Sequence, residues 1–370
     1  MAAASETPLK LLVLAGDGIG PEVTEQALRV VDWFAPRLGR PLQIRHGLVG
    51  GAAIEACDEA VSDAVVAEAK ASDAVLFGAV GGERWDARPV GRRPESGIIR
   101  LRRELDVFAN LRPAIAYPEL ADASALRPEL VDGLDIVVVR ELTSGVYFGQ
   151  PRGQETTATG ARRAFDTQAY TDAEIARVCR AAFELARGRS GRVCSVDKAN
   201  VMETGRLWRT VAAEVGAEFP DVELSHMYAD NCAMQLLRRP KQFDVIVTDN
   251  LFGDILSDAA AMLTGSLGLA PSASLGRPRT DGSALGLYEP VHGSAPDIAG
   301  QGVANPLAAI LSFALCLKHS FGRPDLALQL DAAVRRTLSQ GFRTPDIAGP
   351  QARPIGTVAM TDAVLAALDT

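Results

Sequence analysis

Short apolar runs alternate along the chain with longer segments whose apolar residues recur at helical spacing. The short runs are rich in Val, Leu and Ile and are bounded by Gly, Asp or Asn, which is typical of buried strands. They predict strands at residues 11–15, 74–79, 134–140, 192–196 and 243–248. The longer segments predict helices at residues 21–34, 61–71, 98–105, 172–187, 203–215, 232–237, 253–264, 306–319 and 325–339. This alternation favours an α/β fold with a substantially parallel sheet.

Two segments depart from this pattern. Residues 141–166 carry Gly, Thr and aromatic side chains, with alternation around Tyr147, and we interpret them as a β-hairpin arm. Residues 271–285 are rich in Ser, Gly, Arg and Pro, and we interpret them as an exposed loop. The sequence contains no evident repeat or flexible linker, so two domains would have to exchange the chain more than once.

Length and charge narrow the class of protein. At 370 residues the chain exceeds the size at which a single core stops growing, so two domains are expected. The 38 Lys and Arg against 46 Asp and Glu give a net charge of −8. This balance argues against nucleic-acid and membrane-surface partners, because both favour a basic face. It leaves small anionic substrates open, since a local arginine cluster can override the net charge.

Cysteine usage and hydropathy favour a cytoplasmic protein. The five cysteines are scattered and form no C-x-x-C motif, which is typical of free thiols in a reducing compartment. Residues 1–10 are Ala-rich and polar, without the basic start and apolar run of a signal peptide. The longest apolar stretch, residues 307–317, is interrupted by Ser312 and is far too short to span a membrane.

A glycine-rich turn at residues 16–21 follows a predicted strand and opens a predicted helix, as a dinucleotide-binding fingerprint would. The third glycine of G-x-G-x-x-G would fall at position 21, which is Pro21. The acidic residue expected about twenty positions later is also missing. We therefore expect a non-Rossmann fold, in which this turn shapes the wall of a cleft.

The most informative motif is an acidic pair in the segment N-L-F-G-D-I-L-S-D at residues 250–258. On a helix, Asp254 and Asp258 project from one face, and no Lys or Arg occurs between residues 250 and 273 to balance them. A hard divalent cation would resolve the repulsion, with Mg²⁺ or Mn²⁺ favoured over zinc because neither His nor Cys accompanies the pair. Taken alone, the pair is also compatible with a solvated acidic helix edge.

Three arginines are candidates for binding a dicarboxylate. Arg102 falls on a short predicted helix, Arg112 in a predicted loop before Pro113, and Arg140 at the carboxyl end of a predicted strand. Strand ends in α/β sheets are where ligands gather. Guanidinium groups bind carboxylates bidentately, so three converging arginines would suit such a substrate.

Two residues are candidates for proton transfer. Lys198 follows a predicted strand closely and is a candidate proton acceptor, while Tyr147 in the predicted arm is a candidate general acid. Considered singly, both residues are also compatible with ordinary structural roles, as a surface lysine and a packed tyrosine.

A glycine-bounded loop that begins His292-Gly293-Ser294-Ala295 is a candidate nucleotide site. His292 is able to stack on a base. Asp297 in the same loop is able to accept hydrogen bonds from ribose hydroxyls while repelling a 2′-phosphate, which favours NAD. A purely structural turn is the alternative.

In combination, these motifs resemble those of the 3-isopropylmalate dehydrogenases of leucine biosynthesis, within the β-decarboxylating dehydrogenase family that includes isocitrate dehydrogenases. The resemblance runs from about Leu11 to beyond Asn305. It is carried by GDGIGPEVT at 16–24, GAVGGERWD at 78–86, FANLRPA at 108–114, VRELTSGVYFGQPRG at 139–153, SVDKANVMETGRLWR at 195–209, NLFGDILSD at 250–258 and EPVHGSAPDIAGQGVANP at 289–306.

The resemblance implies a two-domain α/β fold with a mixed, largely parallel sheet. Residues 1–107 together with 265–370 would form the first domain, which holds both chain ends and the adenosine loop. Residues 108–264 would form the second, which holds the metal-binding aspartates. The arm at 141–166 would help to build a homodimer with shared active sites.

The resemblance also implies roles for matched residues in an NAD-dependent enzyme that requires Mg²⁺ or Mn²⁺. Asp254 and Asp258 would hold the metal together with Asp230 of the partner subunit, which would also contact the substrate. The partner's Lys198 would act as the base and Tyr147 as the acid. Substrate carboxylates and the adenosine half of NAD would be bound by Arg102, Arg112 and Arg140, and by His292, Gly293, Ser294, Ala295, Asp297 and Asn305.

The residues beside Arg102 favour (2R,3S)-3-isopropylmalate as the substrate, giving 4-methyl-2-oxopentanoate and CO₂. The segment E-S-G-I-I at 95–99 has two branched apolar side chains where isocitrate enzymes of the family bind a third carboxylate. Burying an isopropyl group against Ile98, Ile99 and Val201 would favour it by roughly 1–3 kcal/mol. A carboxylate left there without a donor would cost considerably more.

Two alternatives stay open. One is a related decarboxylating dehydrogenase acting on tartrate, D-malate or isocitrate. The other is a non-catalytic nucleotide-binding or regulatory protein, whose signature would be the loss of Lys198, Tyr147 or an aspartate, and these are all present. The chain departs from the family pattern at Arg100, where a small residue is expected, and in a longer loop at 277–284.

Overall fold

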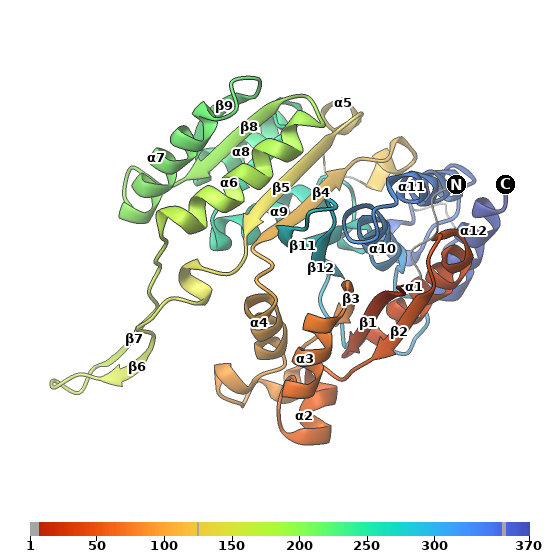
Figure 1. Ribbon diagram of the computed structural model, residues 1–370, viewed down its shortest axis with the longest axis horizontal. Coiled ribbons are helices and arrows are strands. Elements are labelled where there is room, and N and C mark those ends of the chain that lie inside the picture. Colours follow the sequence, from red (N-terminus) through yellow and green to blue (C-terminus); the bar gives the residue numbers. More distant parts are fainter. Residues whose placement is uncertain (1–6, 124–125, 350–352) are drawn as a thin grey trace.

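A ten-stranded sheet runs through the molecule, with helices on both of its faces (Figure 1). The computed structural model describes residues 7–123, 126–349 and 353–370. The strands are β1 (Leu9–Gly16), β2 (Leu42–His46), β3 (Ala74–Ala79), β4 (Ala109–Ile115), β5 (Asp135–Glu141), β6 (Gly153–Thr156), β7 (Arg162–Phe165), β8 (Arg192–Asp197), β9 (Glu223–Tyr228), β10 (Val245–Thr248), β11 (Pro271–Pro278) and β12 (Ala284–Pro290). The helices are α1 (Gly20–Phe34), α2 (Gly51–Cys57), α3 (Asp63–Ala71), α4 (Glu95–Glu104), α5 (Pro128–Val131), α6 (Asp172–Arg187), α7 (Glu203–Ala217), α8 (Ala229–Arg238), α9 (Asn250–Met262), α10 (Leu307–His319), α11 (Pro324–Ser339) and α12 (Thr357–Leu368). The predicted α/β class is confirmed.

The sheet is parallel at its two flanks and antiparallel at its centre. Its strand order is β2-β1-β3-β12-β11-β4-β5-β10-β8-β9. The pairs on each flank are parallel, whereas β12–β11, β11–β4 and β4–β5 are antiparallel. The chain reaches β4 from α4 and β11 from α9, so the central strands join two halves of the sheet that are each built largely from parallel units.

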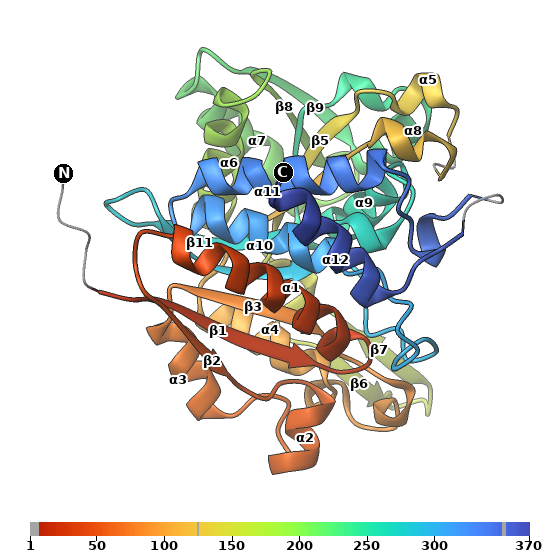
Figure 2. The ribbon, with the colours of Figure 1, turned by 90° about the vertical axis from the view of Figure 1, so that its right-hand side faces the viewer.

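Alternation along the strands sends apolar side chains to two different layers of helices. Leu111 and Val137 join one continuous core with residues of α1, α6, α7, α10, α11 and α12, and we call this side of the sheet the α6 face. Ile136 and Val138 point the other way, toward α5, α8 and α9, and we call this side the α9 face. On the α9 face a separate core, which includes Leu101 of α4, covers the other half of the sheet. Figure 2 shows α1, α10, α11 and α12 packed side by side over the α6 face.

The predicted arm is confirmed as a hairpin, although it is shorter than the segment at 141–166. Strands β6 and β7 form a separate two-stranded antiparallel sheet, which extends away from the rest of the chain (Figure 1). Tyr147 precedes this hairpin in a 3₁₀ turn, Gly145–Tyr147, so the alternation around it does not mark a strand.

The prediction of an exposed loop at residues 271–285 is wrong. Strand β11 occupies most of that segment, and its first four residues are buried in the centre of the sheet. The polar composition misled the prediction because a buried hydroxyl finds a partner there: Asn110 Nδ2 donates to Ser274 Oγ at 3.0 Å. The exposed part is short and comprises the last two residues of β11, Arg277 and Pro278, and the connection to β12.

No helix among the described residues is both long and apolar enough to cross a bilayer.

Candidate active site

The amino end of α9 fixes the acidic pair against the centre of the sheet. Asp249 caps the helix, since its carboxylate accepts the backbone N–H of Phe252 at 2.8 Å. Gly253 lets the helix approach β5 closely, because a Cβ at that position would lie 2.6 Å from Cγ of Arg140. Asp254 is thereby brought within reach of the guanidinium group of Arg140.

Arg140 lies near the carboxyl end of β5, as predicted, and its side chain is almost fully buried. Its Nε and Nη2 both donate to Oδ1 of Asn250, at 2.9 and 2.7 Å, and its Nη1 donates to Asp254. Burial and the neighbouring guanidinium of Arg112 lower the pKa of Arg140 to about 10, so the group remains cationic at neutral pH.

Arg112 lies in β4 rather than in the loop expected from Pro113, which itself pairs within the strand. Its Nη1 donates to Ser257 Oγ at 2.8 Å and to Asp258 Oδ1 at 3.0 Å. The same nitrogen lies 3.2 Å from Asp254 Oδ1. Since β4 and β5 are neighbours, two guanidinium groups face one helix.

The cations missing from the local sequence around the acidic pair therefore come from distant strands. Burial raises the pKa of Asp254, but the charges of Arg140 and Arg112 outweigh it, and the pKa lies below its usual value. Burial raises the pKa of Asp258, which the guanidinium of Arg112 only partly offsets. Both carboxylates retain exposed surface, at 32% and 53% of the side chain, so oxygens remain accessible to a cation.

Arg102 completes a set of three arginines. It belongs to α4, as predicted, and its Nη2 lies 2.6 Å from Oε1 of Glu289 in β12. Its charge contributes to the pKa values of both Arg140 and Asp254, so the three guanidinium groups converge. Its Nε is buried without a hydrogen-bond partner among the described residues, and a substrate carboxylate would supply one.

Tyr147 contacts the acidic pair from the base of the arm. Its hydroxyl donates to Asp254 Oδ2 at 2.9 Å, and its ring centre lies 5.4 Å from Cζ of Arg140. Tyr147 also lines an open cavity of about 810 Å³ with Ile99 and Arg100. The structure separates the predicted isoleucine pair, because the side chain of Ile98 is buried in the core beneath α4.

Lys198 and Asp230 form a second group within the chain. Lys198 Nζ lies 2.6 Å from Oδ1 of Asp230, and this contact holds the pKa of Asp230 below its usual value. Val201 lies beside them and is 72% exposed. No cluster of three or more candidate metal ligands occurs in the part of the chain that the structure describes. Asp254 and Asp258 are thus brought together, while Asp230 is not brought to them within one subunit.

The glycine-rich turn supports the candidate nucleotide loop. The N–H of Ile19 donates to the carbonyl of Ser294 at 2.8 Å, and a Cβ on Gly18 would lie 2.0 Å from that same oxygen. His292 Nδ1 lies 2.9 Å from the carbonyl oxygen of Gly293. The expected role of the turn as a wall of the site is consistent with these contacts.

The remaining residues of this region are placed as follows. Asp297 is exposed, Ala295 has a φ of 37°, and Asn305 is buried. Asn305 Nδ2 donates to Asp346 at 3.0 Å, and its Oδ1 accepts the N–H of Leu307 at 3.0 Å. These two bonds fix the orientation of the amide.

Sequence reasoning missed several residues that hold the site. Asn250 and Ser257 carried a usable signal, because they lie four residues before and three residues after Asp254 and so share its helix face. Glu289 and Asp346 carried no such signal, because their partners, Arg102 and Asn305, are distant in the sequence and come close only in the folded chain.

Comparisons with known proteins agree with this geometry. The profile of the family described as "Isocitrate/isopropylmalate dehydrogenase" matches residues 10–364. The chain is 58% identical over 361 residues to a 3-isopropylmalate dehydrogenase of Cereibacter sphaeroides, covering 97% of this chain and 98% of the relative. It is 58% identical over 358 residues to that of Rhodospirillum rubrum, covering 96% and 97%. A crystal structure of isocitrate dehydrogenase from Methylococcus capsulatus superposes with a TM-score of 0.84 at 35% identity, covering 98% of this chain and 100% of that one.

Proposed function

This chain belongs to the isocitrate/isopropylmalate dehydrogenase family, and we propose that it converts (2R,3S)-3-isopropylmalate to 4-methyl-2-oxopentanoate and CO₂ with reduction of NAD, in leucine biosynthesis. The observation that carries the proposal is the convergence of Arg102, Arg112 and Arg140 on the acidic pair of α9. Three guanidinium groups suit the two carboxylates of a substituted malate. The 58% identity to two 3-isopropylmalate dehydrogenases supports the choice of substrate within the family.

The donor set suits the expected metal. Asp254 and Asp258 offer hard carboxylate oxygens at one helix face, which are the ligands that Mg²⁺ and Mn²⁺ prefer. Asp230 of the partner subunit would complete the set. A metal held there would supply Lewis-acid chemistry beside the substrate, and NAD held by the loop at His292 would supply the hydride acceptor.

The side chains divide the proton transfers between them. Arg102, Arg112 and Arg140 orient the two carboxylates of the substrate. The partner's Lys198 removes the proton of the substrate hydroxyl as the hydride departs. Loss of CO₂ then leaves an electron pair at C3, and Tyr147, whose hydroxyl already points at Asp254, donates a proton to that carbon.

The cofactor and substrate preferences rest on Asp297, which is exposed, and on Ile99, which is partly buried. The carboxylate of Asp297 would repel a 2′-phosphate, so NAD is preferred over NADP. Ile99 lines the cavity beside Tyr147 and offers apolar surface to an isopropyl group. His292, Gly293, Ser294, Ala295 and Asn305 would surround the adenosine.

The surface of the second half of the chain supports the proposal of a homodimer with shared sites. Several apolar side chains on and near α8 and α9 are exposed, at 47–72%. They are Val201, Met234, Leu237, Ile255 and Met262. Exposed apolar patches of this kind are typical of protein interfaces. A partner packed there would bring its own Lys198 and Asp230 toward the acidic pair.

A division into domains at 1–107 with 265–370 and at 108–264 is supported on the α9 face of the sheet, whereas the core on the α6 face continues across both. On the α9 face, the core beneath α4 and the core beneath α9 are separate. Arg102 lies on α4, which contributes to the first of these cores, and the acidic pair lies on α9, which contributes to the second. The four buried cysteines and the exposed Cys57 are all free thiols, which is compatible with the proposed cytoplasmic location.

A kinetic panel tests the activity. We expect the highest kcat/KM for 3-isopropylmalate with NAD, against D-malate, tartrate, isocitrate and NADP. EDTA should abolish the activity, and Mg²⁺ or Mn²⁺ should restore it. A higher kcat/KM for D-malate or tartrate would overturn the choice of substrate, and full activity in EDTA would overturn the metal.

A mixing experiment tests the shared site. Lys198→Ala and Asp254→Asn homodimers should each be nearly inactive, because every site lacks one group. Unfolding and refolding the two together should yield heterodimers with one intact site, restoring about one quarter of wild-type activity. A mixture as inactive as its parents, with heterodimers demonstrated by mass, would place both residues in sites built from one chain.

A further inference from the structure

A cavity of about 430 Å³ lies on the α6 face of the same strands that carry the catalytic arginines. Leu111, Pro113 and Val137 line it. On β4, Leu111 and Pro113 flank Arg112, and on β5, Val137 lies three positions before Arg140. Because successive side chains of a strand point to opposite faces, the residues that line the cavity and the two arginines lie on opposite sides of the sheet. The cavity is therefore back to back with the candidate active site and is separated from it by the sheet. Nothing in the proposed reaction uses it.

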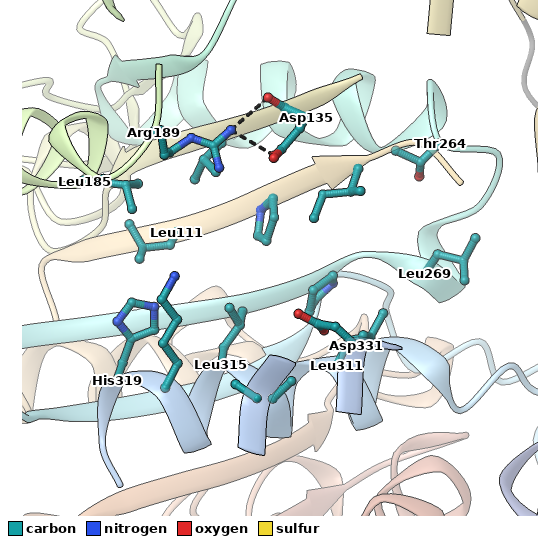
Figure 3. A pocket seen from close by; sticks show the side chains of 18 of the residues that line it. Leu111, Asp135, Leu185, Arg189, Thr264, Leu269, Leu311, Leu315, His319 and Asp331 are labelled. Atoms are coloured by element: carbon teal, nitrogen blue, oxygen red, sulfur yellow. Dashed lines mark hydrogen bonds and ion pairs between the residues drawn. The ribbon is translucent and has the colours of Figure 1, made fainter. Parts of the chain in front are cut away.

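The walls of the cavity come from both halves of the molecule. Figure 3 shows Leu185 and Arg189, from the end of α6 and just beyond it, across the cavity from Leu311 and Leu315 of α10. Leu269 closes the cavity near the point where the chain passes from α9 to β11. The volume falls within the range of small-molecule sites, and a mostly apolar lining with a few polar groups is their usual composition.

The polar groups of this cavity differ in whether they have partners. Arg189 has two ion-pair partners: its Nη2 lies 2.8 Å from Oδ1 of Asp135 (Figure 3), and its Nε lies 2.7 Å from Oδ1 of Asp244. Asp331 of α11 is only partly exposed, and it makes no hydrogen bond or ion pair with residues 7–123, 126–349 or 353–370. Lys318 of α10 also lacks an ion-pair partner within those ranges.

Positive charge surrounds the unpaired carboxylate without contacting it. Lys318 and Arg335 both act on Asp331 electrostatically, although neither comes within ion-pair distance. Arg335 lies over the ring of Tyr117, with Cζ 5.1 Å from the ring centre. His319 is neutral at physiological pH, because burial and the charge of Lys318 lower its pKa to about 4. The cavity therefore offers one free anion, two cations and an apolar floor.

We propose that this cavity is a second binding site, for a zwitterionic α-amino acid with an aliphatic side chain. The ammonium group pairs with Asp331, the carboxylate pairs with Lys318 and Arg335, and the side chain packs on Leu111 and its apolar neighbours. A plain carboxylate leaves Asp331 unpaired, and a plain amine leaves both cations unpaired. The zwitterion is the one of these three chemistries that satisfies both signs of charge.

Calorimetric titration of the free dimer with three probes tests the proposal. The probes are L-leucine, 4-methylpentanoate and 3-methylbutylamine, which share an aliphatic body and differ in charge. We expect L-leucine to bind at least about tenfold more tightly than either other probe. Equal binding of the carboxylate and L-leucine, or no binding of L-leucine, would overturn the proposal.

Two matched variants locate the bound probe. Asp331→Asn removes the charge and keeps the shape, and we expect L-leucine to bind it at least about tenfold more weakly. Asp32→Asn alters an exposed carboxylate on α1 and should leave the affinity unchanged. Thermal unfolding of both variants checks that they fold. Unchanged affinity in Asp331→Asn would place the ligand elsewhere, including the substrate cleft, and would overturn the proposal. The outcome is independent of the proposed reaction, because no turnover is measured.

Discussion

The two faces of β4 and β5 differ in whether their charged side chains have hydrogen-bond or ion-pair partners. On the α9 face, Arg112 and Arg140 each contact several acceptors, and Asp254 is shared between them. On the α6 face, Asp331 lies beside two cations and contacts neither. The same pair of strands thus supports a network in which Arg112 and Arg140 are both paired with Asp254, and a cavity in which Asp331 has no ion-pair partner among the described residues.

The difference shows what each face is built to do. Interlocked hydrogen bonds hold the guanidinium groups in fixed orientations, so a dicarboxylate meets them with little reorganisation. An unpaired carboxylate in a partly apolar cavity raises the free energy of the empty state instead. The α9 face is therefore preorganised, whereas the α6 face favours an occupant.

The largest effect is expected from breaking the network on the α9 face. Arg140→Met would leave Asn250 and Asp254 without their buried partner and would remove a carboxylate clamp. Removing one member of a buried charged pair costs about 3–5 kcal/mol, and we expect kcat/KM for 3-isopropylmalate to fall by about 10²–10⁴-fold. Steady-state kinetics and urea unfolding would measure the two losses.

The neighbouring residue of the same strand supplies the control. Val139 is fully buried and points to the α6 face. Val139→Ala should lower the free energy of unfolding by about 2 kcal/mol while changing kcat/KM by less than about threefold. If both variants lose activity to the same extent for the same loss of stability, the functional division between the faces is refuted.

A smaller effect is expected from Tyr147→Phe, which keeps the ring beside Arg140 and removes one hydroxyl. Loss of a general acid typically lowers kcat by at least about 10²-fold. The KM should change little, because in the proposed mechanism the substrate carboxylates are held by arginines. Product analysis by mass spectrometry, together with kcat, measures the effect. A wild-type kcat would remove Tyr147 from the mechanism.

Local patterns in the sequence predicted the parts of the site that are local in space. Asp254 and Asp258 share a helix face by spacing alone, and the position of Arg140 at a strand end followed from an apolar run. Although β2, β4, β9, β11 and β12 of the large sheet were not predicted, the ends of the predicted helices and strands differ by only a few residues from those in the structure. These features depend on neighbours within a few positions along the chain.

Features that depend on pairing between residues distant in the sequence were not predicted. Pro113 suggested a loop around Arg112, because proline is rare inside sheets, yet β4 pairs on both sides. The serines of β11 suggested exposure, yet Ser274 pairs with a residue 164 positions away. The cavity on the α6 face is bounded by strands and helices from across the chain, and no local pattern encodes its volume.

The smallest predicted effect concerns Asp331→Asn on the α6 face. This substitution should raise the free energy of unfolding, whereas the preceding variants lose stability or activity. Burial raises the pKa of Asp331 from 3.8 to about 6, while the charges of Arg335 and Lys318 partly offset it. A raised folded-state pKa means that the stabilising contribution of the protonated group is complete below pH 3.8 and is lost as the pH rises through about 6. Asp331→Asn does not titrate, so it should be more stable than wild type above that range.

We expect a gain of about 1–2 kcal/mol at pH 8, because solvent contact reduces the full value of a shift of about two units. The gain should shrink toward zero as the pH approaches 4. Urea unfolding at pH 4.5 and pH 8 measures it, and Asp32→Asn, which alters an exposed carboxylate outside the cavity, is the matched control. A loss of stability at pH 8 would mean that Asp331 is already paired, and the contrast between the two faces would disappear. Saturating L-leucine should offset this gain by about 1.4 kcal/mol for each tenfold difference in affinity, since it binds the wild type more tightly than the variant.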